Sequence, residues 1–286
     1  MRVCPKWPGL VFLLVSLAGP AVGAPEEDAS ARRDDSTGTG SEAAGLSADT
    51  GAPSTATDLD AADIVRRAMD HYRGLSSRAR MTMAIHRPDW ERSLSLDAWT
   101  RGDDHTLVRV TAPARDAGNA TLTVEGNMWT WSPGINRVIK IPSSMMNQNW
   151  MGSDFSNKDV SKDAALVDEY DHRLLDRERH EGQTVYVIES VPHEEAAVAW
   201  GREVLRIRAD WVLLEQRFYD QAGALVKTLV SRDIRVMDGR PVAAVMRMGR
   251  VDRPGEWTEL HTRDVDFDIA LSDSLFTLSS LRNPRQ

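Results

Sequence analysis

The sequence contains 286 residues, of which 43 are acidic and 35 are basic, so its formal charge is −8. An acidic protein repels phosphate backbones at long range, and the composition therefore argues against nucleic acid as a partner. The chain has 11 methionines and 9 tryptophans but only 5 phenylalanines. Methionine is common on surfaces that accept varied apolar ligands, and ordinary core packing is the alternative explanation.

The N-terminal residues have the features of a signal peptide. Arg2 and Lys6 precede an apolar run over residues 8–18, which is shorter than the roughly 20 residues of a membrane span. Small residues follow, and we expect cleavage after Gly23, so that residues 1–23 are removed. An uncleaved anchor is the alternative. The protein is therefore expected in the periplasm, soluble after cleavage.

The position of the one cysteine argues against a lipid anchor. Cys4 lies before the apolar run, whereas a lipoprotein needs its cysteine at the cleavage site. The mature chain would then have no disulfide and no thiolate metal site. Residues 24–57 are small and polar and predict a disordered linker. Residues 58–286 remain for folding, and these roughly 230 residues are enough for one sizeable domain or two small ones.

A helix is predicted at the start of this folded region. Apolar residues recur at helical spacing from near Asp58, and charged side chains occupy the opposite face. Gly74 is predicted to end the helix. The apolar face consists of Ile64, Val65, Ala68, Met69, Tyr72 and Leu75.

Alternating apolar and polar residues then predict eleven or twelve short strands joined by hairpin turns such as Asp238-Gly239. Antiparallel strands with one apolar face need a curved sheet, a barrel or a sandwich. The fold is therefore predicted to be mainly β with a few helices. The expected strands are residues 81–85, 94–98, 108–110, 120–124, 129–131, 138–141, 185–191, 204–211, 214–219, 225–234, 242–248 and 257–267.

Residues 143–170 interrupt the strand pattern and are called the cover segment below. Ser156 is predicted to cap a short helix, with Asp159 as the acidic partner of a capping box. An interruption of this length between strands is more often a lid than a passive loop, and we expect it to close an apolar cavity. Its large apolar side chains are Met145, Met146, Trp150, Met151 and Phe155.

The sequence has no recognisable catalytic or metal-binding motif. None of the seven histidines is spaced as in HxH, HxxxH or HExxH. Asp264, Asp266 and Asp268 resemble the start of a calcium loop, but Ile269 and Leu275 stand where that loop needs glycine and glutamate. We therefore predict no enzyme, no metal and no cofactor. A hydrolase built from two carboxylates that the fold brings together is the alternative.

Several short passages are typical of one bacterial family. Residues 151–159 read MGSDFSNKD, close to the family's MGSDFSxxD signature. The other matching passages are WTWSP at 129–133, NRVIKIP at 136–142, GQTVYVIESVP at 182–192, YDQAG at 219–223, LVKT at 225–228, VDF at 265–267 and LFTL at 275–278. From about Asp58 to Leu281 the chain thus resembles the bacterial outer-membrane lipoprotein-sorting proteins, whose fold is similar to that of the periplasmic lipoprotein carrier LolA.

The resemblance implies a half-open barrel of about 11 antiparallel strands wrapped around helices, with an apolar interior that holds acyl chains. The signature itself is interpreted as structural. Gly152 permits a sharp bend, Asp154 can accept backbone N–H groups in a turn, and Phe155 would pin the cover segment to the core. The chain departs from many relatives at residues 147–149, where Asn-Gln-Asn replaces aromatic residues.

The function that the resemblance implies is a periplasmic carrier of lipidated or amphiphilic cargo. An inner-membrane transporter or an outer-membrane acceptor would exchange the cargo with a monomeric carrier. The alternative is a sensor or adaptor module that binds a lipid-like ligand and regulates a membrane partner. Since a slip of one residue exchanges the two faces of a strand, the wall of the cavity is a provisional assignment. The candidate wall residues are Met81, Met83, Leu94, Leu96, Trp129, Trp131, Met246 and Met248.

Overall fold

One antiparallel sheet forms the frame of the protein. A computed structural model describes residues 59–161, 165–196 and 198–282, so the predicted signal peptide with Cys4 and the predicted linker lie outside the described residues. The strands are β1 Ser76–Arg87, β2 Trp90–Arg101, β3 His105–Ala112, β4 Ala120–Val124, β5 Asn127–Ser132, β6 Arg137–Ile141, β7 Tyr170–His180, β8 Gln183–Pro192, β9 Arg202–Arg208, β10 Leu213–Tyr219, β11 Leu225–Met237, β12 Arg240–Arg250 and β13 Trp257–Phe267.

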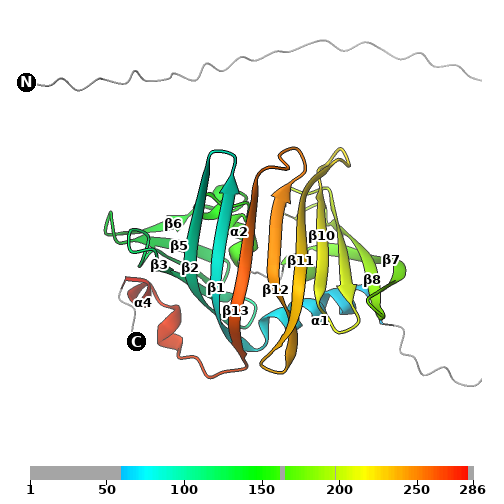
Figure 1. Ribbon diagram of the computed structural model, residues 1–286, viewed down its shortest axis with the longest axis horizontal. Helices are drawn as coiled ribbons and strands as arrows, with labels where there is room; N and C mark the ends of the chain where they lie inside the picture. The colour runs from blue at the N-terminus through cyan, green and yellow to red at the C-terminus, as the bar shows by residue number, and fades with distance from the viewer. Residues whose placement is uncertain (1–58, 162–164, 197, 283–286) are drawn as a thin grey trace, which may run out of the picture. The chain divides into compact units, whose positions relative to one another are not determined.

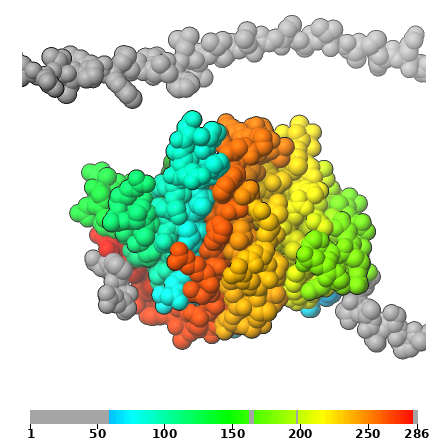
Figure 2. All heavy atoms as spheres, viewed as in Figure 1, coloured from blue at the N-terminus to red at the C-terminus, as the bar shows by residue number. Residues whose placement is uncertain are grey.

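The sheet is open and runs in the order β6-β5-β4-β3-β2-β1-β13-β12-β11-β10-β9-β8-β7. β1 pairs with both β2 and β13, so the early and late strands of the chain meet at the centre of the sheet (Figure 1). β6 and β7 form the two edges and do not pair with each other. Figure 2 shows the outer face, where the central strands lie side by side. The predicted mainly β, half-open architecture is confirmed.

The sheet has 13 strands, more than the sequence pattern predicted, because β7 was missed. Its sequence, YDHRLLDRERH, is mostly charged. A shift in register between Leu174 and Asp176 also breaks the alternation on which strand prediction depends. An edge strand pairs on one side only, and charged side chains there discourage pairing with another chain. The unusual composition of β7 therefore follows from its place in the sheet.

Helix α1 (Ala61–Arg73) lies on the inner side of the sheet and passes behind the strands in Figure 1. Its predicted apolar face is buried at Ile64, Val65 and Ala68, which pack with apolar residues of β8 and β9. Gly74 ends the helix with a positive φ of 66°, and its N–H donates to the carbonyl of Asp70. Leu75, which the spacing assigned to the apolar face, follows the end of the helix and is exposed.

The remaining helices are short. Two lie in the cover segment, α2 (Asn157–Ser161) and α3 (Ala165–Asp168), together with two 3-10 turns, η1 (Ser143–Met145) and η2 (Trp150–Gly152). The last two are η3 (Asp273–Phe276) and α4 (Leu278–Arg282), which pack Phe276 and Leu281 against β3, β4 and β5. These C-terminal helices pack on the outer face near one edge of the sheet, because Leu107 and Leu122 alternate along their strands with Val108 and Thr121, which lie on the side of the cavity and Trp150. Helix α1 lies on the inner side near the other edge.

Candidate functional site

A cavity of about 390 Å³ lies on the inner side of the sheet, bounded by α1 and the cover segment. Its volume falls within the range of about 300–1,000 Å³ that is usual for small-molecule sites. Most of the side chains that face it are apolar. They come from α1, from β2 and from the strands between β10 and β13, and they include Met69, Leu96, Phe218, Leu229, Met246 and Met248.

Strand register explains how these residues come to share one wall. Met248 of β12 lies opposite Leu229 of β11, and Met246 lies opposite Ser231. Since side chains two positions apart point to the same face of a strand, both pairs face the cavity. The thioether side chains are flexible and polarizable, which suits a surface that contacts variable apolar groups.

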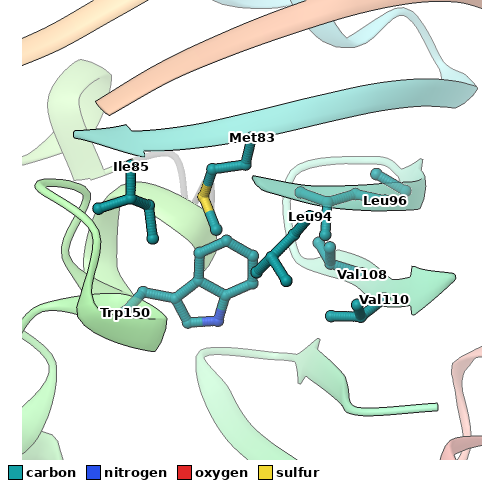
Figure 3. Close-up of a cluster of buried hydrophobic side chains, with 8 residues drawn as sticks. Met83, Ile85, Leu94, Leu96, Val108, Val110 and Trp150 are labelled. Carbon is teal, nitrogen blue, oxygen red and sulfur yellow. The ribbon is translucent and has the colours of Figure 1, made fainter. Parts of the chain in front are cut away.

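Trp150 fixes the cover segment to the other half of the sheet. Its ring is 4% exposed and packs among apolar side chains of β1, β2 and β3 (Figure 3). The indole Nε1–H donates to the hydroxyl of Thr121 at 3.0 Å, so the polar atom of the ring is satisfied. The surrounding side chains are those of Met83, Ile85, Leu94, Leu96, Val108 and Val110. Trp150, Leu96 and Val108 also line the cavity, so this cluster forms one end of it.

A buried ion pair holds the turn that follows Trp150. Asp154 accepts from both terminal nitrogens of Arg87, at 3.0 and 3.2 Å, and from the hydroxyl of Thr258 at 2.6 Å. Arg87 also donates to the carbonyl of Gly152, whose φ of 80° is favourable for glycine. Among the described residues the partners of the Asp154 carboxylate are therefore side chains, not the backbone N–H groups that the sequence suggested.

The short helix α2 carries the cover segment toward the cavity. Ser156 and Asp159 exchange the hydrogen bonds of a capping box, with Asp159 Oδ2 accepting from the Ser156 N–H at 2.8 Å. The same oxygen accepts from Lys227 of β11 at 3.0 Å. Phe155 packs with Phe218 and Met248. The cover segment thus contacts the sheet on both sides of the cavity.

The cavity has a polar end, formed by side chains of neighbouring strands. Glu203 of β9 is paired with Phe218 of β10, which is paired with Lys227 of β11. Glu203 is 3% exposed and accepts from the Tyr170 hydroxyl at 2.8 Å and from the amide of Gln216. Burial raises the pKa of Glu203 above its ordinary value. Burial also raises the pKa of Tyr72, another cavity residue, to about 12.

Lys227 is buried between two aromatic rings at this polar end. Its ammonium lies 4.6 Å from the ring centroid of Phe218 and 5.3 Å from that of Trp200. Both distances are within the range of cation–π attraction. Its hydrogen bond to Asp159 makes it the polar contact between β11 and α2. A buried charge of this kind is costly unless it is paired, and Asp159 supplies the pair.

The predicted wall residues occupy three different places. Met81, Leu96, Met246 and Met248 face the cavity. Met83 and Leu94 lie beneath Trp150, and Trp129 and Trp131 pack in the cluster around the C-terminal helices. Their roles in ligand binding stay predictions.

Within the cover segment, Trp150 and Phe155 are buried. Met146 and Met151 are half-buried, and Met145 is exposed. The segment therefore uses its two aromatic rings, rather than its methionines, as the main contacts with the sheet.

Sequence reasoning missed Glu203, Lys227 and Trp200 as cavity residues. A signal was present for the first two. Glu203 stands two residues before Leu205, and Lys227 stands two residues before Leu229, so each polar residue occupies the apolar face of its strand. Trp200 lies between strands, where no period could place it.

Within residues 59–161, 165–196 and 198–282, no cluster of three or more histidine, cysteine, aspartate or glutamate side chains could hold a metal ion. No helix in the same ranges is long and apolar enough to cross a membrane.

The open antiparallel sheet, with α1 and the cover segment on its inner side, defines a LolA-like fold, and solved structures share it. A domain described as an outer membrane lipoprotein-sorting protein, from Vibrio parahaemolyticus, is 25% identical over 78% of this chain and 98% of its own, with a TM-score of 0.68. A DUF1329 family protein from Desulfovibrio piger is 26% identical over 77% and 97%, with a TM-score of 0.69. A LolA superfamily protein from Nitrosomonas europaea is 21% identical over 77% and 99%, with a TM-score of 0.65.

A family model described as "Uncharacterized protein" matches residues 102–283, more than half of the sequence, and the chain belongs to that family. No curated protein matches it. The resemblance that the sequence motifs predicted is confirmed by these structural relatives.

Proposed function

We propose that this protein is a periplasmic carrier, not an enzyme, and that it binds the apolar part of lipidated or amphiphilic cargo in the cavity. The observation that carries the proposal is the cavity itself, about 390 Å³ in volume and faced mainly by apolar side chains under a fixed cover segment. Apolar groups that leave water for such a site gain roughly 25 cal/mol for each Å² that is buried.

The comparisons support the same class of function. The relative from Vibrio parahaemolyticus is described as a lipoprotein-sorting protein, and lipoprotein acyl chains are apolar cargo of the required kind. A carrier of this kind would receive and deliver its cargo through an inner-membrane transporter or an outer-membrane acceptor. Lipids extracted from protein purified under gentle conditions should then be present in stoichiometric amounts and identifiable by mass spectrometry.

A cavity-filling variant tests the location of the site. Ser231 of β11 faces the cavity, so Ser231→Phe should place a ring in the space that cargo occupies. We expect the affinity for the neutral dye N-phenyl-1-naphthylamine to fall about tenfold, which corresponds to the lost burial of about two methylene groups. Dye fluorescence measures the affinity, and thermal unfolding checks that the variant is folded.

Val236→Phe is the matched control. Val236 lies on the same strand but is 75% exposed, so the same ring there should leave dye affinity unchanged. Equal affinities of the two variants for the dye would place binding outside the cavity. Absence of both copurified lipid and dye binding would overturn the proposed carrier function.

A further inference from the structure

We propose that the polar end of the cavity is a head-group site for an amphiphile with an anionic head, carboxylate or phosphate, and that Lys227 binds this head. This inference rests on the proposed function, because it assigns the cargo of the same cavity. It adds a chemical class to the ligand: a chain with a negatively charged oxygen at one end.

The first step of the argument is the position of Lys227. In register, Glu203, Phe218, Lys227 and Arg250 follow one another across β9, β10, β11 and β12, and all four face the cavity. The next row inward, two residues along each strand, contains Leu205, Gln216, Leu229 and Met248 and is mostly apolar. The wall therefore changes from apolar to polar within one repeat of the strands, as a site for an amphiphile requires.

The second step concerns hydrogen-bonding capacity. An ammonium group has three N–H donors. Within the described residues, Lys227 donates one hydrogen bond, to Asp159, and its other contacts are the ring faces of Phe218 and Trp200. A buried donor that lacks an acceptor is unfavourable, and an ionised acceptor gives the stronger bond. The remaining N–H donors of Lys227 are therefore suited to an ionised acceptor on a ligand in the cavity.

The third step is that the neighbouring polar groups already have partners. Both carboxylate oxygens of Glu203 accept from protein donors, Tyr170 and Gln216. Arg250 is paired with Asp252, and Lys158 with Glu169, each by a hydrogen-bonded ion pair. What distinguishes Lys227 from these two cations is burial: Lys227 is buried, whereas Lys158 is half-buried and Arg250 is exposed, so water can reach their remaining donors. A cationic head would be repelled by Lys227, and a neutral head would gain less.

Competition between single-chain amphiphiles tests the inference directly. Dodecanoate, dodecyl phosphate, dodecanol and dodecyltrimethylammonium, each below its micelle concentration, would displace N-phenyl-1-naphthylamine from the full mature protein. We expect dodecanoate or dodecyl phosphate to bind about tenfold more tightly than dodecanol, which corresponds to one charge-assisted hydrogen bond, and the ammonium compound to bind most weakly. The ratio of the two anions then shows whether the head is a carboxylate or a phosphate.

Variants separate this role from a structural one. Lys227→Met keeps an unbranched side chain between the two rings but removes the ammonium. In this variant the anions should bind no more tightly than dodecanol, and the affinity for dodecanol itself should stay within about twofold of the wild-type value. Arg80→Met is the matched control, since Arg80 is an exposed cation of β1 and should leave the order unchanged. Asp159→Asn keeps a capping side chain but removes the competing charge, and it should strengthen the preference for anions.

The outcomes are distinct. If all four amphiphiles bind equally well to wild type, or if Lys227→Met retains the preference for anions, the head-group site is wrong and the apolar cavity stands. If none displaces the dye because the dye itself does not bind, the proposed carrier function fails and the head-group site fails with it. If Lys227→Met does not fold, the head-group site is still tested by the order of amphiphile affinities in the wild-type protein and by the Asp159→Asn variant.

Discussion

The two sides of the cover segment differ in what lies beneath them. Under Trp150 the space between cover segment and sheet is filled by side chains of β1, β2 and β3. Beyond Phe155, toward β9–β12, the same segment spans a cavity. The cover segment is therefore part of the core on one side and bounds the cavity on the other. Because the contacts around Trp150 hold the cover segment in place, its other side does not need side chains packed beneath it.

The filled side should contribute most of the stability. Trp150→Ala removes a buried ring from a packed cluster, and such changes cost about 3–5 kcal/mol of unfolding free energy. Urea denaturation measures the loss. Trp90→Ala is the control, because Trp90 is 48% exposed and its removal should cost less than about 1 kcal/mol. Equal losses for the two variants would mean that the cover segment is not a core element.

The second prediction concerns the turn between the two sides. Asp154→Asn removes the charge from a buried pair with Arg87 but keeps an amide that can accept from Thr258. We expect a loss of about 2 kcal/mol, since hydrogen bonds to charged groups are worth about 1.5–3 kcal/mol. Asp264→Asn, in the exposed pair with Arg80, should cost less than about 1 kcal/mol. If Asp154→Asn lowers the unfolding free energy no more than this control does, the ion pair does not hold the cover segment in place.

Substitution on the cavity side should change the unfolding free energy least, and the size of this change should depend on pH. Because burial raises the pKa of Glu203 in the folded protein, the unfolded chain releases this proton at a lower pH than the folded chain does. The contribution of Glu203 to stability therefore falls as pH rises from its ordinary pKa to its folded pKa. Asp159, which faces it, raises the pKa further, and Lys227 lowers it.

Glu203→Gln removes the carboxyl group and with it the decrease in stability that accompanies its ionisation. The amide of Gln216 can turn so that its oxygen accepts a hydrogen bond from the new side chain. Stability of the variant should fall less than that of wild type between pH 4 and 8, as measured by urea denaturation at each pH. Parallel curves for the two proteins would show that Glu203 does not titrate differently in the folded state. The same prediction distinguishes the polar end from the cluster around Trp150, whose members are apolar side chains.

Periodicity was sufficient for much of the fold. The helix at the start, the strands with one apolar face and the cover segment were all predicted, because burial on one face leaves a clear pattern in the sequence. β7 was missed because an edge strand can form without that pattern. The half-open form of the sheet followed from the family resemblance, which implied about 11 strands where the sheet has 13. Periodicity alone allowed a curved sheet, a barrel or a sandwich equally well.

The candidate site was harder to predict, for a geometric reason. Met81 and Leu96 are directly opposite each other on β1 and β2, and so are Met83 and Leu94. Both pairs point to the inner side, and both belong to or border the cluster around Trp150, yet only Met81 and Leu96 also line the cavity. Alternation assigns a residue to a face, whereas its distance along the strand decides what covers it. That distance depends on where the cover segment settles, which is a tertiary property.

The open edges of the sheet have a further consequence for the size of cargo. In a closed barrel the radius is set by the number of strands and their stagger, so the interior cannot expand without breaking hydrogen bonds. Here β6 and β7 are separate, and the curvature between them can change while every strand keeps its neighbours. If the cavity holds cargo as proposed, longer or branched chains could be accommodated by a change in curvature that keeps the hydrogen bonds between strands.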